Sequence, residues 1–276
     1  MKTLKPLPIT YITDRESENR MKWFDKYKYP LLNAITLEQE KKEECRGIDF
    51  LSLQSAITFF GELTTGLKAG DGVRVYFASP SGDGTVNEDR CGILTLIFVK
   101  TKGTSDDPPY FYINDQKTSA QISSNGAKEW VHNYQLLKRD RMFRTLSYND
   151  RLGGHKETKH IWFSLKQMEQ TLDEMKYQAK EHGLIVSCFG IRFTSYTNKD
   201  YVFLGSKIPN HKRRERLTIC FTFIGANGDI GIKDIDPVEF AKRLKLTKDK
   251  SFGDTFDTGI PAPPPSDTKE ALDSQI

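Results

Sequence analysis

A chain of 276 residues with 37% hydrophobic and 11% aromatic residues can bury a sizeable core, so this composition excludes a globally disordered protein. The formal net charge of +4 lacks the strong basic excess of a dedicated nucleic-acid binder. Residues 1–20 contain no apolar run of a signal peptide, and no stretch approaches the length of a membrane span. The sequence therefore predicts a cytoplasmic protein without a membrane partner.

The first segment, residues 1–45, is predicted to be a helical N-terminal extension. A helix is expected to begin at Asp14, with Met21 and Phe24 on one face. Pro30 is expected to end or kink this helix, because proline lacks the N–H that continues it. The charged stretch 36–45 is predicted to be a solvated helix.

The second segment, residues 46–115, is predicted to be an αβ module. A short apolar run (48–53) precedes a helix over 54–67, and Ser52 is placed to cap that helix. The strand GVRVYFA (72–78) follows, then a polar loop and a second strand over 93–101. The two strands are expected to pair as a hairpin, because the connecting loop is too short and polar for a crossover helix.

The same order of elements returns over residues 160–250. An apolar run (160–165), a helix (166–183), the strand containing GIRFTSY (190–196) and a strand over 216–225 follow one another. FLSL (50–53) matches WFSL (162–165), Arg74 matches Arg192, and Thr95 matches Thr218. The repeated order predicts an internal duplication.

The remaining segments are predicted to carry little regular structure. Residues 116–159 are expected to be an irregular linker, with Gly153 and Gly154 as its hinge. A helix is expected to start at Asp236, with Glu239 completing a capping box. Residues 251–276 are expected to be a flexible Pro-rich tail, unpacked from Gly259 onward, and whether this tail docks to another protein stays open.

The fold class that follows is α+β. We expect two tandem βαββ-like modules whose strand–helix–strand start makes a parallel pair, so that each sheet is mixed. Helices are expected to cover one face of these sheets.

The strand GVRVYFA, followed by a hairpin loop and LTLIFVKTKG, resembles a group of small bacterial proteins of unknown function. These proteins carry a Gly-aliphatic-Arg-aliphatic-Tyr-Phe-Ala strand, then a Thr-aliphatic strand and a Pro-rich C-terminus. FDTGIPAPPP (256–265) resembles that ending, although Ala262 and Ser266 stand where the group has cysteines. The resemblance covers about half of the chain and implies an αβ fold without an activity.

Four residues on the repeated strands are candidate binding residues: Arg74, Tyr76, Arg192 and Tyr196. Strand alternation places the Arg and the Tyr of each strand on one face, away from the apolar side chains. A guanidinium beside a phenol suits a carboxylate, a phosphate or a peptide. The alternative is a structural arginine that pairs with an acid of its own module.

Two basic segments, 138–144 and 211–216, offer a second kind of surface. Within the latter, four side chains are candidate phosphate contacts: Lys212, Arg213, Arg214 and Arg216. The alternative is a pair of solvated loops with ordinary charge runs.

Catalytic motifs are missing from the sequence, and no catalytic residue, cofactor or metal site is predicted. The four cysteines, Cys45, Cys91, Cys188 and Cys220, lack metal spacing and are predicted to be free thiols. His182 is interpreted as a helix C-terminal residue, where a cation suits the helix dipole. The protein is therefore expected to be a non-enzymatic interaction or accessory protein with a protein partner. A nucleic-acid binder that uses the basic loops, and an enzyme with an unrecognised site, remain as alternatives.

Overall fold

The computed structural model describes residues 6–8, 12, 14–38, 43–81, 90–148, 157–197, 201–203, 206–208, 215–249 and 260–261. Two helices begin the ordered body, α1 (Asp14–Tyr27) and α2 (Tyr29–Leu37). The first helix starts at Asp14 as predicted, and Pro30 stands in the first turn of α2, where its missing N–H breaks no helical bond. Phe24 and Leu32 are buried in the main core, so this segment packs into the body of the protein. Glu44 is also buried, in contrast to the solvated helix expected over 36–45.

The strands and helices predicted for the two halves of the chain form close to their predicted positions. The first half contains β1 (Gly47–Asp49), α3 (Leu53–Thr64), β2 (Gly72–Ala78), β3 (Thr95–Lys102), β4 (Ser105–Ile113) and β5 (Ser119–Ile122). The second half contains β6 (His160–Ser164), α6 (Leu165–His182), β7 (Cys188–Ser195), β10 (Leu217–Gly225) and β11 (Gly228–Ile230). Ser52 caps α3 and Ser164 caps α6, each by accepting a bond from a backbone N–H of the first turn. The α+β class is confirmed.

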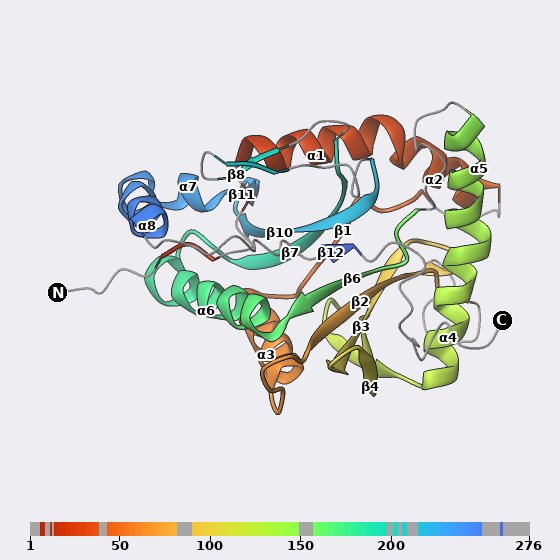
Figure 1. The fold of residues 1–276 in the computed structure, drawn as a ribbon, viewed down its shortest axis with the longest axis horizontal. Helices are drawn as coiled ribbons and strands as arrows, with labels where there is room; N and C mark the ends of the chain where they lie inside the picture. Colours follow the sequence, from red (N-terminus) through yellow and green to blue (C-terminus); the bar gives the residue numbers. More distant parts are fainter. Residues whose placement is uncertain are drawn as a thin grey trace.

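The two halves exchange their first strands. One sheet has the order β1-β7-β10-β11, so β1 joins the strands of the second half. The other sheet has the order β12-β6-β2-β3-β4-β5, where β12 is Ile260–Pro261, so β6 joins the strands of the first half. Helices α3 and α6 therefore each carry the chain from one sheet to the other, and they contact each other (Figure 1).

This exchange corrects two expectations. Every strand pairing that the structure describes is antiparallel, so the parallel pairs and the mixed sheets were wrong. The boundaries 46–115 and 160–250 do not separate the sheets, because each sheet contains strands of both halves.

The two arginine strands hold matching positions in spite of the exchange. Arg74 lies opposite Trp162 of β6 and Val99 of β3, and Arg192 lies opposite Gly47 of β1 and Cys220 of β10. Each arginine is thus on a central strand, between an exchanged strand and the strand that follows in its own half. Cys220 lies opposite Arg192, as Val99 lies opposite Arg74. If Thr218 matched Thr95, as predicted, Thr222 would lie opposite Arg192 instead. The predicted register of the last strand is therefore two residues off, a shift that leaves every side chain on its predicted face.

The main core lies between the two sheets and is rich in phenylalanine. Phe59 of α3 contacts Phe98 of β3, and Phe60 contacts Phe189 of β7. A second core cluster covers the opposite face of the six-stranded sheet, where Trp130 packs edge-on against Tyr112. Trp130 belongs to α4 (Ser124–Asn133), so helices cover both faces of this sheet and the expectation of one covered face was wrong.

Residues 116–159 are more regular than predicted. They contain β5, α4, a π-helical segment η2 (Tyr134–Arg139) and α5 (Asp140–Tyr148). Helices α4 and α5 run along one side of the molecule in Figure 1. Ala127, Trp130, Val131 and Tyr134 are buried at helical spacing, a pattern present in the sequence. Gly153 and Gly154 lie outside the described residues.

The last described elements lead to the tail. Helices α7 (Ile232–Ile235) and α8 (Pro237–Asp249) follow β11, and a small hairpin pairs β8 (Tyr201–Phe203) with β9 (Ser206–Ile208). Ile260 and Pro261 pair with β6 as the edge strand β12, so these two residues are part of a sheet, at an edge position that tolerates proline. The rest of the predicted tail lies outside the described residues. Among the described helices, none is long and apolar enough to cross a membrane.

Candidate functional site

Arg74 and Tyr76 are buried and bind an acid of the same sheet. The guanidinium of Arg74 forms an ion pair with Asp106 of β4 and donates to the backbone oxygen of Thr104 at 2.7 Å. The Tyr76 hydroxyl donates to the other carboxylate oxygen of Asp106 at 2.8 Å. Burial raises the pKa of Asp106 above its ordinary value, and the neighbouring Arg74 opposes that shift. This arrangement matches the alternative in which the arginine pairs with an acid of its own half.

Arg192 and Tyr196 are also engaged within the protein. Arg192 donates to both carboxylate oxygens of Asp229, at 2.8 and 2.5 Å, and to Asp49 at 2.6 Å. Because Asp49 belongs to β1, this arginine holds the exchanged strand against β7. Tyr196 is 2% exposed, and the guanidinium carbon of Arg20 lies 4.5 Å from the centre of its ring.

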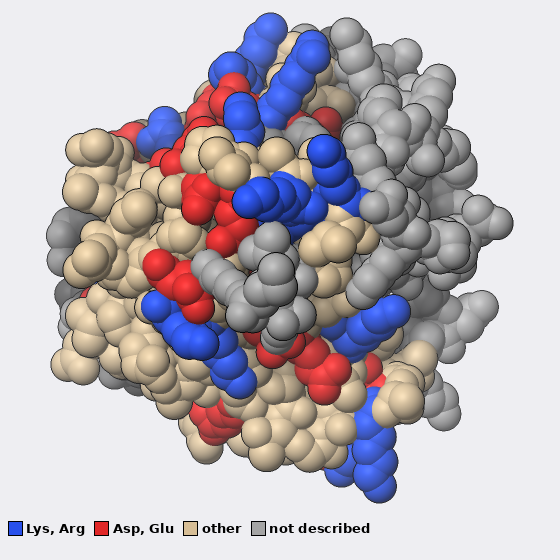
Figure 2. All heavy atoms as spheres, turned by 90° about the vertical axis from the view of Figure 1, so that its left-hand side faces the viewer, with Lys and Arg blue, Asp and Glu red and all other residues tan. Residues whose placement is uncertain are grey.

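The basic segments are only partly buried where the structure describes them, since Arg144 is exposed and the side chain of Arg141 is 43% exposed. Lys138 is fully buried and forms an ion pair with Glu44 at 2.5 Å. Arg139 and Arg216 are 3% and 4% exposed, and burial lowers the pKa of Arg216. Lys212, Arg213 and Arg214 lie outside the described residues. Figure 2, which shows the end of the molecule that carries α6 and α8, has acidic and basic side chains intermingled among the described atoms.

A cavity of about 160 Å³ lies along β10, between the two sheets. This space is well above the roughly 10–15 Å³ that one water molecule needs. We call it the β10 groove. The residues that line it come from β10, its neighbours in both sheets, α6, α1 and the N-terminal segment: 218–223, Ile161, Phe163, Thr171, Glu174, Phe189, Tyr196, 230–232, Ser17, Arg20, Pro8 and Ile12. Its floor is aromatic, with Phe221 beside Phe163 of β6 and Phe189 of β7.

Among the described residues, no strand pairs with part of the β10 edge that faces this groove. Strands of an antiparallel sheet direct the N–H and C=O groups of alternate residues to opposite sides. The N–H of Tyr196 donates to Arg216, so the even-numbered residues of β10 bond toward β7, and the odd-numbered ones point outward. Among the odd-numbered residues, Leu217 has partners for both backbone groups. Its N–H donates to the carboxylate of Glu157, and its C=O accepts from the hydroxyl of Thr158.

Farther along β10, Phe223 pairs with Ile230 of β11. Ile219 and Phe221 lie between these two covered positions. They have no strand partner on the outward side among the described residues.

Two charged side chains stand in the wall of the groove, and internal partners hold both. Arg20 donates to Glu16 at 2.8 Å, and Glu174 accepts from Arg243 at 3.0 Å. The groove therefore combines an apolar floor, a few fixed polar groups and unpaired backbone groups. This combination suits a binding site for a ligand with its own backbone-like donors and acceptors.

Burial disfavours the reactive thiolate form at two of the four cysteines. All four are free, as predicted. Burial raises the pKa of Cys45 to about 12 and also raises that of Cys188, so these two thiols stay protonated at neutral pH. A thiol in this state is a poor nucleophile.

Comparisons of the chain with models of protein families, with curated proteins and with solved structures find no match. What the fold and the site define is an α+β protein of two interleaved antiparallel sheets with an open strand edge above an aromatic groove. Sequence reasoning identified β10 as a strand but missed its open edge, because strand order is not visible in the alternation of residues.

Proposed function

We propose that this protein is a non-enzymatic, cytoplasmic interaction or accessory protein that binds an extended segment of a partner protein in the β10 groove. The observation that carries the proposal is the pair of outward-facing backbone positions, Ile219 and Phe221, above an apolar floor. A strand added there forms main-chain hydrogen bonds with β10 and inserts alternate side chains into the groove. The Arg74 and Arg192 faces are occupied by internal acids, which leaves this strand edge as the stronger binding surface.

The chemistry of the groove selects the kind of segment. Phe163, Phe221 and Ile161 suit apolar side chains at every second position of the added strand. Affinity from backbone bonds is independent of side chains, so specificity has to come from these apolar contacts and from the fixed charges of Arg20 and Glu174.

An internal duplication, followed by exchange of the first strands, is our proposal for the origin of the two interleaved halves. Its support is the shared position of Arg74 and Arg192 on central strands. In β2 and β7, the backbone groups of the residues that face the main core point toward the exchanged strand, β6 or β1. The N–H of Phe77 donates to the C=O of Lys159, just before β6, and the N–H of Phe193 donates to the C=O of Arg46, just before β1. Superposing β6-β2-β3 on β1-β7-β10 should bring the two arginines together, and a fit that misplaces them would contradict the duplication.

Selection of a random peptide library on the full chain tests the binding function. We expect enriched peptides that alternate apolar and polar residues. N-methylation of those peptide amides that bond to β10 should weaken binding by at least about tenfold, since each lost hydrogen bond costs roughly 0.5–1.5 kcal/mol.

The matched control is N-methylation of the alternate amides, which point away from β10 and should leave affinity nearly unchanged. Equal weakening by both sets of modifications, or no enrichment at all, would argue against strand addition.

A further inference from the structure

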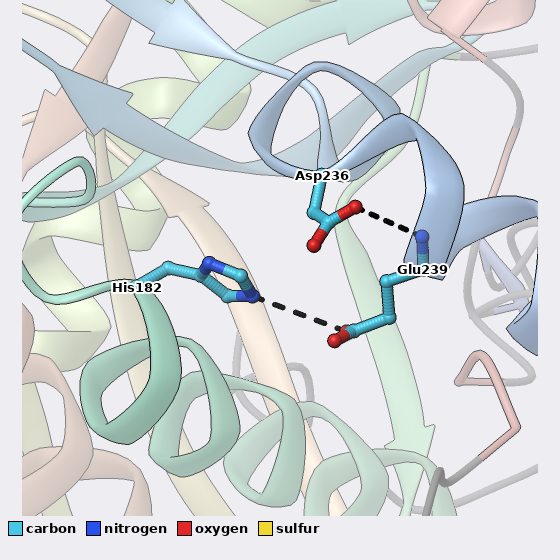
Figure 3. A group of neighbouring side chains, drawn as sticks. All are labelled: His182, Asp236 and Glu239. Atoms are coloured by element: carbon cyan, nitrogen blue, oxygen red, sulfur yellow. Dashed lines mark hydrogen bonds and ion pairs between the residues drawn. The ribbon is translucent and has the colours of Figure 1, made fainter.

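Three potential metal ligands from separate elements converge at one end of the molecule. His182 is the last residue of α6, Asp236 directly precedes α8, and Glu239 lies in the first turn of α8. Figure 3 shows the imidazole and the two carboxylates pointing toward a common space. The ligand atoms of the three side chains all lie within 4.8 Å of one another.

The imidazole nitrogen that faces this space lacks a hydrogen bond. Nε2 of His182 is buried and has no hydrogen-bond partner among the described residues. Its nearest charged neighbour is Oε1 of Glu239 at 3.9 Å, which is too long for a hydrogen bond. A buried nitrogen without a partner is costly, and coordination of a cation would satisfy it.

Asp236 is held so that one of its carboxylate oxygens faces this space. Oδ1 of Asp236 accepts the N–H of Glu239 at 2.9 Å and caps α8, so Oδ2 is the oxygen directed toward the space. The side chain of Glu239 is 10% exposed, which removes most of the water that would otherwise compete for it.

An arginine lies beside the three side chains. Arg243, with an atom 3.9 Å from Glu239, is the nearby cation. Its charge is offset by the ion pair with Glu174, in which both of its terminal nitrogens take part. Two carboxylates beside one imidazole form a set of ligands that suits a divalent cation.

We propose that His182, Asp236 and Glu239 form a binding site for a divalent transition-metal ion such as Zn²⁺. Ligand atoms of a tetrahedral zinc site lie about 3.4 Å apart, since each bond is about 2.0–2.1 Å. The 3.9 Å between Nε2 of His182 and Oε1 of Glu239 is close to this value. One imidazole and two carboxylates favour zinc over the all-oxygen preference of Ca²⁺ and Mg²⁺. Three protein ligands leave the fourth position to water, and the ion joins the end of α6 to the start of α8.

Titration of the full chain, freed of metal with a chelator, tests the site. Calorimetry with Zn²⁺ alone is expected to show saturable binding of one ion, and His182→Ala is expected to weaken it more than about 100-fold, because even second-shell changes cost 10–100-fold. Glu239→Gln keeps the size of the side chain and the N–H that Asp236 caps, and should weaken binding at least about tenfold. Co²⁺ in place of Zn²⁺ should give visible absorption bands that His182→Ala abolishes.

Two variants control for general effects. Asp234→Asn removes an exposed carboxylate of α7, and His132→Ala removes an imidazole of α4, and both should bind Zn²⁺ like the parent protein. Mg²⁺ and Ca²⁺ should bind far more weakly than Zn²⁺. The proposal is overturned if the parent protein shows no saturable Zn²⁺ binding, or if the controls lose as much affinity as His182→Ala.

Discussion

Replacing Lys138 by Met is expected to lower the free energy of unfolding by about 3–5 kcal/mol, the cost of leaving one partner of a buried ion pair alone. Both side chains of the Lys138–Glu44 pair are fully buried. Glu44 also accepts the N–H of Leu94 at 2.7 Å and the hydroxyl of Thr36 at 2.9 Å, so it is fixed in place and cannot turn to water. Urea unfolding of the variant and its parent measures the difference.

A double variant separates the ion pair from simple loss of volume. Glu44→Gln combined with Lys138→Met removes both charges and should recover part of the loss, because no buried charge remains unpaired. Lys128→Met on exposed α4 surface is the matched control and should change stability by less than about 0.5 kcal/mol. A loss below about 1 kcal/mol for Lys138→Met would instead support a solvated basic segment over 138–144.

Replacing Phe60 by Ala is expected to cost about 3–5 kcal/mol, the usual range for a large aromatic side chain removed from a core. Phe60 is fully buried and contacts Phe50, Phe59, Phe189 and Phe221. These neighbours belong to both halves of the chain, so the cavity should destabilise both sheets together. Hydrogen exchange of the backbone amides in β3 and in β7 measures the stability of the two sheets separately.

Thr58→Ala, on the exposed side of the same helix, is the matched control and should have little effect. Loss of protection in one sheet alone after Phe60→Ala would mean that the halves fold independently. That outcome would favour the boundaries 46–115 and 160–250 over the interleaved arrangement.

Much of the local structure could be predicted from the sequence, because local rules govern it. Ser52 and Ser164 cap helices since a hydroxyl at this position accepts a first-turn N–H, whatever the rest of the fold. Asp14 begins a helix and Pro30 fits a first turn for equally local reasons. Alternation in GVRVYFA also fixes which side chains share a face of the strand.

The exchange of β1 and β6 could not be predicted in the same way. Alternation assigns the faces of a strand, but backbone hydrogen bonds accept any neighbour of suitable direction. Lys138 and Glu44 were read as surface charges because charged residues are rarely buried, and only their tertiary pairing reverses that preference. In the β10 groove, the strand itself was predicted. Its open edge was not, because that edge depends on the order of strands in the sheet. The meeting of His182 with Glu239 depends on helix packing.

Hydrogen exchange at the amides of Ile219 and Phe221 tests the β10 groove most directly. In the free protein these two amides should exchange faster than those of Cys220 and Thr222, which bond toward β7. A selected peptide should slow exchange at Ile219 and Phe221 by more than about tenfold and leave Cys220 and Thr222 unchanged. Slow exchange at Ile219 and Phe221 without any peptide, or no change when a peptide binds, would contradict strand addition at this edge.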